Sequence, residues 1–126
     1  MRLEGERVII KTFNIEPMGK PAIQRGIKRK ANFKFDAWRE EIKYYNGFFK
    51  LPKGGFHLLF YFTMPKSWSN KRKTENLNKP HFQKPDADNC CKAFFDSLYP
   101  DNDSFFWDYR VTKLWAEKGR IEIRKL

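Results

Sequence analysis

The chain has 126 residues, of which 26 are Lys or Arg and 15 are Asp or Glu, so its formal net charge is +11. Aromatic residues make up 17% of it, a content that argues against a disordered chain and for one folded core. We therefore predict a single domain over residues 1–126 whose charge attracts a polyanion, with nucleic acid ahead of anionic membrane.

Nothing in the sequence predicts a membrane or secreted protein. The longest largely apolar stretch, residues 56–64, is far shorter than the roughly 20 residues that cross a bilayer. Charges interrupt the first ten residues, where a secretory signal has its apolar run. The two cysteines, Cys90 and Cys91, are too close in sequence for an ordinary disulfide, so we expect reduced thiols and a cytoplasmic location.

The amino-terminal part predicts a strand and then a loop. Residues 7–14 are rich in β-branched and aromatic types, and Pro17, Gly19 and Pro21 interrupt any regular pattern after them. Residues 20–34 contain no acid, so they form either a solvated surface or one that contacts phosphates. The candidate DNA-binding residues there are Lys20, Arg25, Lys28, Arg29 and Lys30.

A helix and a buried strand are predicted next. Apolar residues recur at helical spacing before a stop at Asn46-Gly47, namely Phe35, Trp38, Ile42 and Tyr45. The near-continuous apolar run at 56–64 predicts a strand that is buried on both faces. We expect His57, inside this run, to pack rather than to bind a metal.

A second basic segment lies between residues 66 and 84. Its candidate DNA-binding residues are Lys66, Lys71, Arg72, Lys73 and Lys84. Trp68 and Phe82 lie among these cations, where aromatic rings either stack on bases or anchor a loop, and anchoring is favoured.

The carboxyl-terminal part predicts two strands. Residues 109–116 and 120–126 are β-type runs separated by three residues, which is typical of a closing hairpin. In the second run Ile121 and Ile123 alternate with polar residues, so one face is expected to be buried and the other wet.

The acids are gathered in one window. Residues 86–108 hold six of the seven aspartates and a single base, Lys92, so the window sums to −5 and the rest of the chain to +16. Such a window is either an acidic solvated loop or a cation site.

Within this window we predict a helix from about Asn89 to Leu98. If the chain before it is extended, Asp86 and Asp88 point to the same side. Two carboxylates with little nearby base favour a hard cation such as Mg²⁺ or Mn²⁺ between them. The alternative needs no metal, because Asp88 could cap the helix and pair with Lys92.

A third carboxylate would close such a site. Asp101, Asp103 and Asp108 are the candidates, and the reach of an extended return from the helix favours Asp103. Asp103 could equally be a turn residue, and Asp108 could pair with Arg110 on the same face of a strand.

The stretch KPDADNCCKAFFDSL, residues 84–98, resembles the RusA family of Holliday junction resolvases. The segment Asn102-Asp103-Ser104 is similar to the acidic element that opens the late strand in that family. EPMGKP at 16–21 and FTMPKSW at 62–68 are also similar to family elements, so the resemblance spans most of the chain.

The resemblance implies an α+β domain with a mixed β-sheet packed with helices. It implies a homodimeric, Mg²⁺-dependent endodeoxyribonuclease of phage or prophage type, with Mn²⁺ able to substitute, that resolves four-way DNA junctions by paired hydrolysis. The catalytic residues that it implies are Asp86, Asp88, Asp103 and Lys92, with the three aspartates as metal ligands. The alternative is a non-catalytic, structure-selective nucleic-acid-binding module whose aspartates only cap and solubilise.

Overall fold

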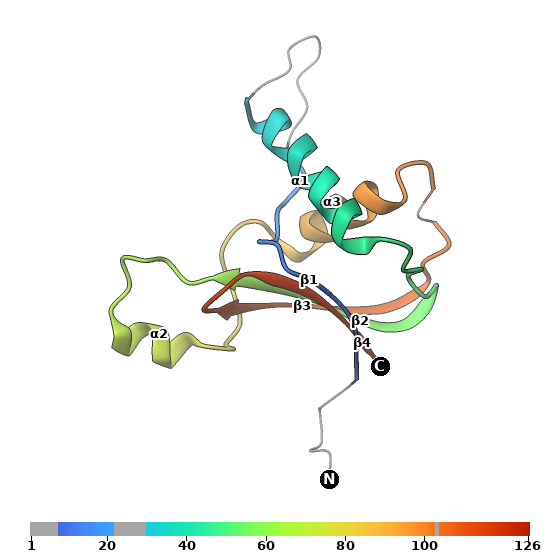
Figure 1. The fold of residues 1–126 in the computed structure, drawn as a ribbon. Helices are drawn as coiled ribbons and strands as arrows, with labels where there is room; N and C mark the ends of the chain where they lie inside the picture. The colour runs from blue at the N-terminus through green and yellow to red at the C-terminus, as the bar shows by residue number, and fades with distance from the viewer. Residues whose placement is uncertain (1–7, 22–29, 103) are drawn as a thin grey trace.

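The computed structural model describes residues 8–21, 30–102 and 104–126, which form four strands and three helices (Figure 1). In chain order these are β1 (Ile9–Phe13), α1 (Lys30–Asn46), β2 (Gly54–Thr63), α2 (Asn70–Asn76), α3 (Ala87–Leu98), β3 (Asp108–Ala116) and β4 (Arg120–Lys125). None of the helices in these ranges is both long enough and apolar enough to span a membrane.

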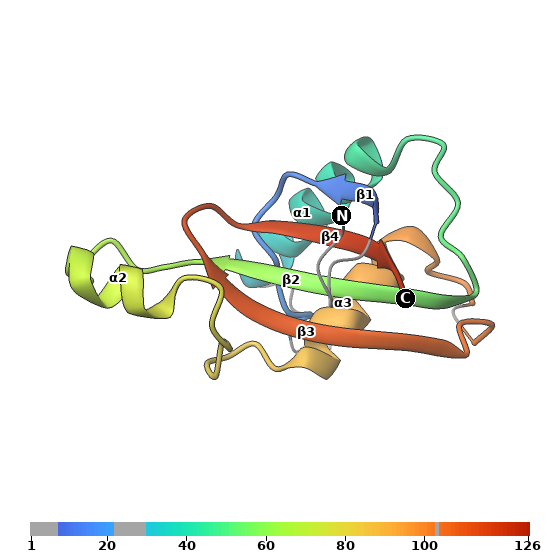
Figure 2. The same cartoon turned by 90° about the horizontal axis from the view of Figure 1, so that it is seen from below.

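The strands form one mixed sheet in the order β1-β4-β2-β3 (Figure 2). β4 is antiparallel to both β1 and β2, whereas β2 and β3 are parallel. Helices α1 and α3 lie on one face of the sheet, and α2 projects from one end (Figures 1 and 2). The predicted α+β class with a mixed sheet is therefore confirmed.

The predicted hairpin between the last two strands is wrong, because β2 lies between β3 and β4. The apolar run of β2 is buried most completely when both of its edges are paired, so it takes an inner position. The link at 117–119 must then cross two strand spacings, about 9.6 Å, which is within the reach of three extended residues.

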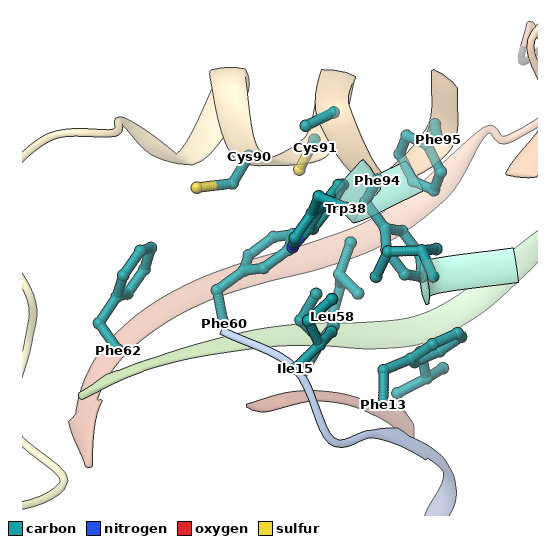
Figure 3. Close-up of a cluster of buried hydrophobic side chains, with 14 of the residues drawn as sticks. Phe13, Ile15, Trp38, Leu58, Phe60, Phe62, Cys90, Cys91, Phe94 and Phe95 are labelled. Carbon is teal, nitrogen blue, oxygen red and sulfur yellow. The ribbon is translucent and has the colours of Figure 1, made fainter. Parts of the chain in front are cut away.

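The main core lies between the sheet and the two long helices (Figure 3). Phe60 of β2 and Phe94 of α3 are fully buried, with ring centroids 6.3 Å apart in an edge-to-face arrangement. Phe13 of β1 meets the same Phe94 ring at 5.1 Å. Trp38 and Ile42 of α1 are also buried, which confirms the predicted core-facing helix.

The other face of the sheet is not covered by any of the described helices (Figure 1), yet some of its side chains are buried. Glu122 is only 4% exposed, because Arg120 and Arg124 hydrogen-bond its carboxylate, each at 2.7 Å. Arg120 also lies 3.7 Å above the ring of Tyr61. Burial disfavours the charged form of Glu122, but the hydrogen bonds from the two arginines outweigh it and lower its pKa. The predicted wet face is thus wrong at Glu122.

Glu16 ties the loop after β1 to the end of the sheet. Its carboxylate accepts hydrogen bonds from Thr63 N and Thr63 Oγ1, and its backbone carbonyl accepts one from Trp38 Nε1 at 2.8 Å. Thr63 Oγ1 also accepts from Gly119 N at 2.8 Å. A Cβ atom at Gly119 would overlap the Glu16 carboxylate, so a side chain here would displace this carboxylate from Thr63.

This contact predicts the cost of a side chain at Gly119. We expect Gly119→Ala to lower the free energy of unfolding by about 1–3 kcal/mol, as overpacking usually does. In a Glu16→Ala background the same substitution should cost less than about 0.5 kcal/mol. Urea denaturation of the four variants measures both values, and an equal cost in the two backgrounds would contradict the overlap.

Candidate active site

The acidic motif forms the first turn of α3. Asp86 is the N-cap, with extended backbone angles, and its Oδ1 accepts a hydrogen bond from Asn89 N at 2.8 Å. Asp88 lies inside the first turn, where the helix dipole favours negative charge. The alternative in which Asp88 caps the helix is therefore wrong, and the start predicted near Asn89 is two residues too late. The helix begins at Ala87.

This start changes how the two carboxylates are related. Since Ala87 is already helical, Asp86 and Asp88 do not point to the same side as they would in an extended segment. The expected convergence on one side of a strand is therefore wrong. The two acids share the amino-terminal turn of a helix, and both residues are exposed.

Lys92 follows Asp88 by one helical turn, and its Nζ lies 3.1 Å from Asp88 Oδ2. The two side chains are 63% and 77% exposed, and an exposed pair of this kind contributes about 0–1 kcal/mol. The ammonium can therefore exchange its carboxylate for another anion at little cost.

Lys113 of β3 holds the segment before the helix. Its Nζ donates to the carbonyls of Gln83 and Pro85, each at 2.7 Å. The Lys84-Pro85 peptide bond is cis. This role of Lys113 was not predicted. The sequence signal for it is a lysine between Val111 and Trp115, on a strand face that packs against the core.

The loop at 16–21 lies against the same turn. Asn89 Nδ2 donates to the Lys20 carbonyl at 3.2 Å, and a Cβ at Gly19 would lie 2.6 Å from both Asn89 Nδ2 and Pro85 Cβ. The ammonium of Lys20 lies 3.4 Å from Asp96 Oδ2. An open pocket of about 510 Å³ lies here, lined by Gly19, Lys20, Pro21, Lys84, Pro85, Asp86 and Asn89.

Other candidate reactive groups near this turn are inert. Burial raises the pKa of Cys90 and of Cys91 to about 12, so neither thiol ionises near neutral pH. Both cysteines are free, as expected. Burial, followed by the charge of Lys113, lowers the pKa of His81 to about 4, which leaves its ring neutral at pH 7. His57 packs as expected, with Nε2 2.7 Å from Thr112 Oγ1.

The candidate late acids are related to this turn as follows. Asp103 lies outside the described residues. Asp108 is the first residue of β3 and pairs with Gly54 of β2. Lys113, whose Nζ binds the Pro85 carbonyl, lies five residues further along β3, which is about 16 Å. Asp108 is therefore distant along the strand from the level of the first turn of α3. Within the described ranges, no group of three His, Cys, Asp or Glu side chains is close enough to hold a metal ion.

The candidate DNA-binding residues fall into three groups. Arg25, Lys28 and Arg29 lie outside the described residues, and Lys30 opens α1. Lys20 and Lys84 line the pocket beside Asp86. The remaining four follow β2 or lie on the projecting α2, namely Lys66, Lys71, Arg72 and Lys73 (Figure 2).

Helix α2 was not predicted, although Ser69 supplies an N-cap signal. Its side chain accepts a hydrogen bond from Arg72 N at 3.2 Å. The Arg72 guanidinium lies 4.0 Å from the centre of the Trp68 ring, which packs on Trp115 at 4.8 Å. The expected anchoring role is therefore confirmed for Trp68.

The sequence matches the family model of endodeoxyribonuclease RusA over residues 15–124. The chain belongs to the RusA family. The match includes the Glu16 loop, β2, β3, all of α3 and β4 as far as Arg124. Every residue that lines the pocket beside Asp86 therefore lies within the matched region. A comparison with curated proteins found no match.

The bridge from Lys113 predicts how the RusA site is held. In Lys113→Met the start of α3 should loosen, because two carbonyls lose a charged donor. Cys90, whose Sγ lies 3.9 Å from the Pro85 carbonyl, reports this opening. In a Cys91→Ala background we expect Cys90 to react with a thiol reagent at least about tenfold faster.

The matched control for this measurement is Lys118→Met, at an exposed position between β3 and β4. It should leave the labelling rate unchanged. An unchanged rate in Lys113→Met would show that the bridge does not hold the site.

Proposed function

We propose that this protein is a metal-dependent, structure-selective endodeoxyribonuclease that resolves four-way DNA junctions by paired phosphodiester hydrolysis. The observation that carries the proposal is the pair of exposed acids, Asp86 and Asp88, in the first turn of α3 within the RusA match. The surrounding charge supports it, because an acidic window of −5 lies in a chain that elsewhere sums to +16.

The donor set at this turn fits Mg²⁺, and Mn²⁺ as a substitute. Asp86 uses Oδ1 to cap the helix, and among the described residues its Oδ2 has no hydrogen-bond partner. Among the described residues, the ion partner of the Asp88 carboxylate is Lys92, and both side chains of this pair are exposed. Carboxylate oxygens that still face water suit a hard cation, whereas the nearby thiols are protonated. A bound ion would supply a water of lowered pKa and stabilise charge on the scissile phosphate.

The chain's own groups have separate roles in this proposal. Asp86 and Asp88 hold the ion, together with a late acid that we assign to Asp103. Lys92 leaves its weak pair with Asp88 and meets the charge that develops on the phosphate. Lys113 is a positioning residue, since it acts through the carbonyls before Asp86.

The basic residues are proposed to bind the arms of the junction. Lys84 and Lys20 stand at the rim of the pocket, where they can contact the phosphates beside the cleaved one. The projecting α2 carries three successive cations on exposed or half-exposed side chains, so it can follow a DNA arm away from the cut. Arg25, Lys28, Arg29, Lys30 and Lys66 complete the proposed DNA-binding set.

We further propose that the active form is a homodimer in which a second copy supplies the late acid. α3 is 12 residues long, about 18 Å. At its far end Phe105 and Phe106 pack on Tyr99, with centroids 5.6 and 5.1 Å away. Phe105 and Phe106, which follow the proposed late acid by two and three residues, therefore lie at the opposite end of α3 from Asp86. A two-fold axis also suits a junction that needs two opposed nicks.

The alternative is a binding module without catalysis, and one observation favours it. Capping explains Asp86, and an ordinary surface pair explains Asp88, with no metal involved. This module would bind DNA equally well with or without Mg²⁺ and would cut none.

Asp86→Asn separates the two functions, because Asn caps helices about as well as Asp. We expect the melting temperature to stay within about 2 °C, consistent with a neutral surface change. Junction binding in chelator should persist, and cleavage with Mg²⁺ should fall at least about 100-fold, as expected from losing a ligand of a catalytic ion. Glu117→Gln, at an exposed position between β3 and β4, is the control. Wild-type cleavage by Asp86→Asn would exclude this carboxylate from the site.

A shared site predicts complementation between two inactive variants. Differently tagged Asp88→Asn and Asp103→Asn chains, co-expressed and purified as mixed dimers, should regain one intact site and cut one strand. Mixing Asp88→Asn with Asp86→Asn should restore nothing, because both changes disable the same half of the site. If the first mixture is also inactive although each chain dimerises, the late acid comes from the same copy. If Asp103→Asn alone still cleaves, Asp103 is not the late acid, and the mixture is repeated with Asp108→Asn.

A further inference from the structure

Phe82 is an exposed aromatic side chain close to the proposed site. It is 90% exposed and lies four residues before Asp86, a span of at most about 14 Å. A single exposed apolar residue is common on a protein surface. The surroundings of Phe82 set it apart.

The backbone on both sides of Phe82 is held firmly. His81 is 5% exposed, stacks on Phe62 at 4.0 Å, and donates its backbone N–H to the Lys113 carbonyl at 3.1 Å. On the other side, the Gln83 carbonyl accepts from Lys113 Nζ at 2.7 Å. Phe82 is thus an exposed ring on a segment that is fixed at both ends by one strand residue.

Phe82 does not perform the anchoring role that its sequence context favoured. Trp68, the other aromatic residue of the basic segment, packs on Trp115 and is covered by Arg72. Among the described residues no aromatic ring or cation packs on Phe82. The expectation of anchoring is therefore wrong for this residue.

The charges around Phe82 identify the chemistry of its partner. Lys79 and Lys84 flank it and are exposed. A protein or a second copy with an apolar patch would have to bury its contact among these cations, whereas a nucleic acid strand offers phosphates to the cations and a base to the ring.

We propose that Phe82 stacks on a base at the branch point of the junction and so favours branched over linear DNA. This inference rests on the proposed function. In a continuous duplex each base is already stacked on two neighbours, and inserting a ring costs a few kcal/mol of unstacking. At a branch point the continuous stack of bases is interrupted, so a base face is available without that cost. Phe82 is therefore a specificity-determining residue rather than a catalytic one.

The test measures dissociation constants of full-length variants for a labelled four-way junction and for a linear duplex of the same sequence, in chelator. Phe82→Leu keeps an apolar side chain but removes the π-face, and Phe82→Trp keeps the π-face. Base stacking on an aromatic ring is worth about 1–3 kcal/mol, so Phe82→Leu should weaken junction binding about 5- to 150-fold and leave duplex binding unchanged. Phe82→Trp should bind the junction like the wild type.

Phe48→Ala is the control, since Phe48 is fully exposed in the link between α1 and β2 and should not alter either constant. The inference would be overturned if Phe82→Leu bound the junction as tightly as the wild type does. It would also be overturned if Phe82→Leu lost the same factor in affinity for the junction and for the duplex. Because binding is measured without metal, a wild-type protein that prefers junctions but does not cut them would refute the proposed function and leave this inference standing.

Discussion

The ammonium of Lys113 is the contact on which the organisation of the site depends. It lies on β3, 5.8 Å from the centre of the Phe62 ring, and donates hydrogen bonds to the carbonyls of Gln83 and Pro85. A charged donor with two carbonyl acceptors is stronger than neutral hydrogen bonds. This bridge ties the segment before α3 to the sheet, next to the carboxylates of the first turn.

Other contacts of the fold also hold α3 and its first turn in position on the sheet. α3 is fastened to the sheet by Phe94, which meets rings from β1 and β2, and the loop at 16–21 closes over its start through Asn89. The Glu16 carboxylate joins this loop to the end of β2. The charged side chains are separated in the same way. The acids that are proposed to hold a metal ion lie at the start of α3, and the basic side chains that are proposed to bind DNA line the pocket and lie on α2.

Sequence patterns predicted the elements in which the spacing of apolar residues is enough to show which face is buried. Phe35, Trp38 and Ile42 specify one helix face, and the apolar run of β2 specifies an inner strand. Patterns failed where a distant partner decides. The three-residue link at 117–119 looks like a hairpin, and only the presence of β2 between the strands makes it a crossing. Likewise Asp86, rather than Asp88, caps α3, and the segment before it is tied to Lys113 of the distant strand β3 by two hydrogen bonds. The surroundings of Glu122 likewise include a distant partner, Tyr61 of β2, because Arg120 lies over its ring and Arg124 hydrogen-bonds its hydroxyl.

The most direct test of the account is cleavage of a labelled four-way junction by the wild-type protein, beside a linear duplex of the same sequence, with Mg²⁺, with Mn²⁺ and with chelator. The account predicts paired, symmetric nicks in opposed strands of the junction with either metal, none with chelator, and an uncut duplex. Junction binding without any metal-dependent strand scission would contradict it.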